Sequence, residues 1–186
     1  TTESEERNAS LRDKEIENRV KILRTVKLFS SLQISEIKQI AMALHVAIFT
    51  KSDVMTKQGD VAHWLYVIVS GEADVWYEVN SNERNHLATF HAGDVFGEMG
   101  LMTGEPRLAT VTARIDTECY RIDKNTFESI MIARPELANE FAHLIDERQA
   151  ALKSVKLEES AQGQNRQATI LTNIRRFFHL PRKDGG

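Results

Sequence analysis

Two oppositely charged residues, Glu98 and Arg107, lie nine positions apart in a stretch that also contains Gly97 and Gly100. Residues 98–102 are long enough for one helical turn, and the start of such a turn exposes unpaired N–H groups that favour an anion. The glycines let the backbone approach that anion closely. Arg107 offers a forked, permanently charged donor to a phosphate, whereas an ionised Glu98 only accepts and therefore suits a sugar hydroxyl. The spacing predicts a site for a ligand that carries hydroxyl groups and one phosphate.

A second interpretation of the same residues stays open at this point. Glu98 and Arg107 could pair with each other in a surface turn, where an exposed ion pair contributes only about 0–1 kcal/mol. Residue types and spacing do not decide between the two.

The segments FGEMGL (96–101) and PRLATV (106–111) resemble the phosphate-binding cassette of the cyclic nucleotide-binding domain family. That family includes regulatory subunits of protein kinase A, the bacterial catabolite activator and cyclic-nucleotide-gated channels. The resemblance runs from about Val26 to Lys156. It implies that Glu98 binds the ribose 2′-hydroxyl, that Arg107 binds the cyclic phosphate, and that the amides around Met99, Gly100 and Ala109 complete the cradle.

The same resemblance places further contacts outside the cassette. Val75 and Leu87 match apolar positions that flank the bound sugar and base, although a plain core role fits them equally well. Leu152 matches a position from which a long C-terminal helix covers the base, and Arg148 lies one turn earlier on the phosphate side. The predicted contact set is Val75, Leu87, Phe96, Gly97, Glu98, Met99, Gly100, Arg107, Leu108, Ala109, Arg148 and Leu152.

The choice of nucleotide rests on two apolar residues. Relatives that prefer cyclic GMP often carry threonine directly after the cassette arginine, and here that residue is Leu108. Leu152 can offer only an apolar cap without hydrogen bonds to the base edge. We therefore expect cyclic AMP (cAMP) to be favoured over cyclic GMP (cGMP).

Length and composition limit the function classes. The 186 residues suit one domain with arms, and 41% hydrophobic and 27% charged residues are ordinary for a soluble globular protein. A net charge of −3 argues against general attraction to nucleic acid. Cys119 is the only cysteine, so a reducing, cytoplasmic compartment fits. No signal peptide or transmembrane run is visible, and the missing initiator methionine suggests a trimmed or excised piece.

The elements that must position the site are mainly strands. Residues 1–25 form a polar arm, loose at its start, that becomes helical towards Leu23, and a second helix opens at Ser35. From Val46 the apolar period changes to two, and some eight short strands with glycine turns indicate an eight-stranded β-roll (jelly roll). We expect a mainly β fold with N-terminal helices and a short cassette helix. A helix from Thr126 to Ala133 precedes a long lid helix that starts at Pro135.

Two catalytic or metal-dependent alternatives are weak. A small barrel could be a metal-binding cupin, but the six histidines show no ligand spacing. Cys119 has no nearby base to lower its pKa. We expect no cofactor, no metal and no enzyme activity. The histidines considered are His45, His63, His86, His91, His143 and His179.

The domain is predicted to span 26–158, followed by a linker and a basic amphipathic tail, 159–186. The tail could lie on a membrane surface, dock on a partner, or close against its own domain. It is too short for a helix-turn-helix domain, so a transcription factor is disfavoured. Two functions remain: a sensor that passes cyclic-nucleotide binding to a protein partner, or the regulatory part of a larger protein such as a cyclic-nucleotide-gated or mechanosensitive-type ion channel. Either permits a homodimer.

Overall fold

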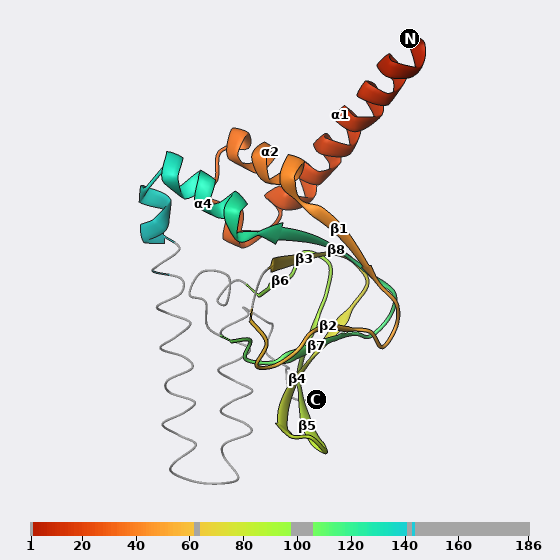
Figure 1. Ribbon diagram of the computed structural model, residues 1–186, viewed down its shortest axis with the longest axis vertical. Coiled ribbons are helices and arrows are strands. Elements are labelled where there is room, and N and C mark those ends of the chain that lie inside the picture. Colours follow the sequence, from red (N-terminus) through yellow and green to blue (C-terminus); the bar gives the residue numbers. More distant parts are fainter. Residues whose placement is uncertain (1, 62–63, 98–105, 141–142, 144–186) are drawn as a thin grey trace, which may run out of the picture.

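The structure, a computed structural model, describes residues 2–61, 64–97, 106–140 and 143. Eight strands within these residues form two four-stranded antiparallel sheets that face each other as a roll, and helices cover one of the sheets (Figure 1). The expected eight-stranded β-roll is thereby confirmed. None of the described helices combines the length and the apolar character that crossing a membrane requires.

The first sheet, in the order β1-β8-β3-β6, lies against the helices. The second sheet has the order β2-β7-β4-β5. The glycine turns expected between the strands are confirmed, since Gly59, Gly71 and Gly93 all have positive φ. The strands are β1 (His45–Phe49), β2 (Val54–Thr56), β3 (Trp64–Ser70), β4 (Ala73–Asn80), β5 (Glu83–Phe90), β6 (Val95–Phe96), β7 (Thr110–Ala113) and β8 (Thr117–Asp123).

Helix α1 (Glu3–Arg24) begins earlier than the sequence suggested. The loose start expected for the N-terminal arm is wrong, because the chain is helical from Glu3. Acidic residues fill the first turn, where they interact favourably with the helix dipole, and Glu15 pairs with Arg19 at 2.6 Å one turn apart. The N-terminal half of α1 extends away from the roll, and only its last turns reach the core, through the fully buried Leu23 (Figure 1).

The predicted helix after Ser35 is α2 (Ile34–Ala43), which follows the short helix η1 (Lys27–Phe29). Its buried face carries Ile37, Ile40 and Ala41. Phe29 is also buried and stacks on Phe127 of α4 (Lys124–Ala133) with ring centroids 5.9 Å apart. These helices pack on the outer face of the first sheet and so leave the interior of the roll to the site.

Side chains of the two sheets meet in an interior cluster. Its members are Met55, Tyr66, Ile68, Ala73, Val75, Leu87, Ala88, Phe90, Phe96, Val111, Ala113 and Cys119, with Phe49, Trp64, Tyr77 and Ala109 packed against it.

The chain after β8 follows the expected course as far as the structure describes it. Asp123 caps α4 by accepting from the backbone N–H of Thr126 at 2.9 Å, and α4 ends at Ala133. Residues 136–140 and 143 are again helical. The rest of the predicted lid helix and the predicted cassette helix lie outside the described residues.

Candidate functional site

Arg107 lies just before β7, and its main-chain N–H and carbonyl groups are both hydrogen-bonded. Its N–H donates to the carbonyl of Asp60 at 2.9 Å, and its carbonyl accepts from the N–H of Gly59 at 2.8 Å. The guanidinium reaches β3, where Nη2 donates to the carbonyl of Trp64 at 3.1 Å. Its Cζ lies 5.7 Å from the ring centroid of Tyr66. The turn before β3 and the start of β3 together fix this side chain.

The electrostatic setting of Arg107 is unusual for a half-buried cation. Burial lowers the pKa of its guanidinium, while Tyr66 and Asp60 act in the opposite direction. No carboxylate among the described residues lies within ion-pair distance of it. An arginine remains charged even so, and a partly desolvated charge without a counterion is costly unless an anion joins it. The described part of the site therefore offers a pre-positioned donor for an anion.

Gly97, directly after β6, makes room for that guanidinium. Its φ is +88°, and a Cβ there would lie 2.6 Å from Nη1 of Arg107 and 2.8 Å from the carbonyl oxygen of Trp64. Any other residue would be strained and would displace the arginine. The sequence predicted Gly97 as a place for close approach of a ligand. The structure assigns it a contact with the side chain expected to bind that ligand.

Phe96 belongs to an aromatic layer that includes Tyr66, the ring next to the guanidinium of Arg107. Phe96 is buried and stacks on Tyr66, with ring centroids 4.9 Å apart and planes at 4°, and on Phe90 at 5.4 Å. This layer fixes the end of β6 and so the position of Gly97. Phe96 belongs to the predicted site as a supporting residue of the interior cluster.

The other described members of the predicted set fall into two groups. Val75 and Leu87 are buried in the interior cluster on neighbouring strands β4 and β5, and Ala109 packs against the same cluster. Leu108 is 39% exposed. The structure thus brings Val75, Leu87, Phe96 and Ala109 to one interior, while the predicted Glu98, Met99, Gly100, Arg148 and Leu152 lie outside the described residues.

Trp64 and Tyr66 are site residues that the sequence did not suggest. Trp64 contributes a main-chain oxygen, which any residue type would carry, so no pattern could have indicated it. Tyr66 alternates correctly for a strand interior but shows nothing that links it to Arg107.

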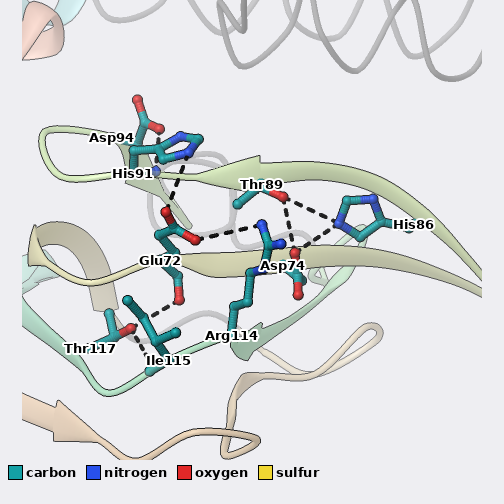
Figure 2. Close-up of polar contacts among 9 residues, drawn as sticks. All are labelled: Glu72, Asp74, His86, Thr89, His91, Asp94, Arg114, Ile115 and Thr117. Carbon is teal, nitrogen blue, oxygen red and sulfur yellow. Dashed lines mark hydrogen bonds and ion pairs between the residues drawn. The ribbon is translucent and has the colours of Figure 1, made fainter.

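A second polar cluster lies on the outer face of the β2-β7-β4-β5 sheet (Figure 2). His86 Nε2 lies 2.8 Å from Asp74 Oδ1, which also accepts from the hydroxyl of Thr89 at 3.0 Å. Glu72, directly before β4, faces Arg114 at 3.6 Å and His91 at 4.0 Å. Each carboxylate is already paired, and the described residues contain no group that could hold a metal ion. The cluster stabilises the sheet.

Cys119 faces the interior of the roll. Burial raises the pKa of its thiol to about 12, with a smaller contribution from Glu118. A thiol with such a pKa carries almost no thiolate near neutral pH, and the thiolate is the nucleophile. Cys119 is a core residue.

Comparison with known proteins gives a consistent picture. A sequence profile described as "Cyclic nucleotide-binding domain" matches residues 47–134. The chain is 35% identical over 109 residues to the cAMP-dependent protein kinase regulatory subunit of Blastocladiella emersonii, an alignment that covers 59% of this chain and 27% of that protein. The chain thus spans about a quarter of that relative's length.

Two solved structures share the fold. The regulatory domain of Toxoplasma gondii protein kinase A in complex with cAMP superposes with a TM-score of 0.62 at 23% identity, covering 70% of this chain and 51% of that chain. The regulatory subunit of a cAMP-independent protein kinase A from Trypanosoma cruzi, bound to guanosine, gives 0.64 at 21% identity, covering 80% and 52%. Residues 47–134 therefore match the cyclic nucleotide-binding domain family, and the two solved structures show that the chain shares their fold.

Proposed function

We propose that this domain binds a 3′,5′-cyclic nucleotide and acts as a non-catalytic regulatory module. The observation that carries the proposal is the half-buried guanidinium of Arg107, which is held by Trp64 and Gly97 and has no carboxylate partner among the described residues. A cyclic phosphodiester carries one negative charge and oxygens that can accept from such a fork. A single arginine can therefore neutralise it.

The remaining contacts follow from the family resemblance. Glu98 accepts from the ribose 2′-hydroxyl, and amides near Met99, Gly100 and Ala109 donate to the phosphate. Val75 and Leu87 contact the sugar and base from the interior of the roll. Arg148 and Leu152 approach from the lid helix, and Leu152 covers the base.

The preferred nucleotide is cAMP. Leu108 follows the phosphate-binding arginine and carries no hydroxyl for guanine. The fold alone does not select the ligand, because the similar Trypanosoma cruzi protein is described as cAMP-independent and bound to guanosine. Arg107 should distinguish cAMP from guanosine, since guanosine has no phosphate.

The output is a shift between two conformations of the helices outside the roll. Binding can change their arrangement only if the ligand contacts are better in one arrangement, and coupling of about 1–3 kcal/mol is usual. The relatives are described as kinase regulatory subunits, which favours a protein partner for this module. An ion channel as the effector stays a prediction.

Calorimetric titration of the wild-type protein with cAMP, cGMP and adenosine tests the proposal. We expect saturable binding of cAMP, weaker binding of cGMP and much weaker binding of adenosine. Replacing Arg107 by alanine should weaken cAMP binding strongly and leave adenosine binding nearly unchanged, because the variant loses only the guanidinium contact with the phosphate. Equal binding of adenosine and cAMP by the wild type would contradict the assignment of Arg107 to the phosphate.

A further inference from the structure

The indole of Trp64 contacts two side chains from other strands of its sheet, the adjacent β8 and the edge strand β1. The guanidinium Cζ of Arg121, on β8, lies 4.6 Å from the ring centroid, and the ring of His45, on β1, meets it edge-on at 5.6 Å and 81°. The register explains the contact. Trp64 is opposite Asp123 and His45 is opposite Arg121, so all three side chains leave the same face of the sheet.

Arg121 does not serve as an ion-pair partner in this arrangement. Its Nε is buried without a hydrogen-bond partner, and no carboxylate among the described residues pairs with it. A buried, unpaired donor is unfavourable and calls for an explanation. Its contact with the face of Trp64 is the one interaction that holds this guanidinium among the described residues.

Trp64 is also the residue whose carbonyl accepts a hydrogen bond from Nη2 of Arg107, at 3.1 Å. It is the first residue of β3, so its main-chain position depends on the contacts of its indole with His45 and Arg121 as well as on pairing with β8. The same oxygen lies 2.8 Å from the Cβ that Gly97 lacks. A small displacement of Trp64 would therefore move the carbonyl oxygen that accepts from Arg107 and change the space beside Gly97 that the guanidinium occupies.

We propose that the stack of His45, Trp64 and Arg121 positions the guanidinium of Arg107, with Arg121 acting as a positioning residue for the phosphate contact. The consequence for ligand affinity rests on the proposed function. The stack itself makes no contact with the nucleotide. Its effect passes through the carbonyl of Trp64.

The test compares two arginines that each stack on a tryptophan. Arg121→Ala removes the contact with Trp64, and Arg84→Ala removes the equivalent contact with Trp76 on the other sheet, where Cζ lies 3.9 Å from the ring. Both lose one positive charge and one stacked guanidinium. We expect Arg121→Ala to weaken cAMP binding about three- to tenfold, the range of a lost cation–π contact, and Arg84→Ala to leave it unchanged. Adenosine binding should be the same in all three proteins.

A double-mutant cycle separates positioning from general electrostatic attraction. If Arg121 acts through Arg107, Arg121→Ala has no further effect on cAMP affinity in an Arg107→Ala background. An effect of equal size in both backgrounds would overturn the proposal, as would equal weakening by Arg84→Ala. Trp64→Phe, which retains an aromatic face, should keep most of the affinity, whereas Trp64→Leu should not.

A structural measurement keeps the inference testable without the ligand. Crystal structures of the wild type and of Arg121→Ala should show Nη2 of Arg107 within hydrogen-bond distance of the Trp64 carbonyl only in the wild type. Retention of that bond in the variant would overturn the positioning role. A wild type that binds no nucleotide would instead count against the proposed function alone.

Discussion

Replacing Gly97 by alanine should have two effects, backbone strain and displacement of Arg107, and a matched control variant can separate them. Gly97 has φ +88° and Gly93 has φ +93°, so alanine is strained at both positions. At Gly93 nothing lies within 4 Å of the added Cβ, whereas at Gly97 it meets Nη1 of Arg107 at 2.6 Å and the carbonyl oxygen of Trp64 at 2.8 Å. Both variants thus carry the backbone strain, and only Gly97→Ala displaces the arginine.

The magnitudes follow from these contacts. A non-glycine residue in the left-handed region costs about 1–2 kcal/mol, which in a chain of this size lowers the Tm by about 2–8 °C in Gly93→Ala. The loss in Gly97→Ala should be at least as large, because its Cβ also meets the carbonyl oxygen of Trp64. Displacing Arg107 removes a charge-assisted hydrogen bond that contributes about 1.5–3 kcal/mol net, or about ten- to 150-fold in affinity. Gly97→Ala should therefore bind cAMP at least tenfold more weakly than Gly93→Ala.

Thermal unfolding and calorimetric titration of the two variants measure both quantities. Equal affinity for cAMP in Gly97→Ala and Gly93→Ala would refute the argument, because it would mean that the space at Gly97 does not set the position of Arg107. A loss of affinity in both variants would point to backbone strain instead.

Three further predictions concern stability and reactivity. Glu36 accepts Nε of Arg134 at 3.0 Å and Nη2 at 2.8 Å, so Glu36→Ala should lower the free energy of unfolding in urea by about 1.5–3 kcal/mol; a change below about 0.5 kcal/mol would class the pair with exposed ones. Burial raises the pKa of Cys119 to about 12, so a thiol reagent at pH 8 should label it only after unfolding, and rapid labelling of the native protein would contradict its burial. Hydrogen bonds from Thr126, chiefly from its hydroxyl, lower the pKa of Asp123 below 3.8. The stability that Asp123 contributes is therefore present above pH 3.8 and is lost as the pH falls through the lowered pKa. The free energy of unfolding in urea should differ less between pH 7 and pH 2 for Asp123→Asn than for the wild type. An equal difference in the two proteins would rule out a contribution from Asp123.

The β-roll could be predicted because its signals are local. Alternation of apolar residues marks the strands, and glycines mark turns that need positive φ. The same signals do not say which face of a strand is buried at a sheet edge. Val46 and Ile48 indicated a strand correctly, yet they are 42% and 75% exposed, because β1 is an edge strand whose interior face carries Phe49.

The candidate site could be predicted only as far as it consists of side chains with distinctive chemistry. Arg107 and Gly97 were identified from residue type and spacing. The carbonyl of Trp64 was not, because a main-chain acceptor leaves no trace in the sequence. The start of α1 was missed for a related reason: charged residues resemble a disordered arm unless their placement against the helix dipole is considered.

The central claim is that the guanidinium of Arg107 receives a cyclic phosphate. A crystal structure of the wild-type protein with cAMP tests it most directly. The account predicts a phosphate oxygen about 2.7–3.1 Å from a guanidinium nitrogen of Arg107, with the ribose directed towards the segment that contains Glu98. A bound nucleotide whose phosphate lies away from Arg107 would contradict it.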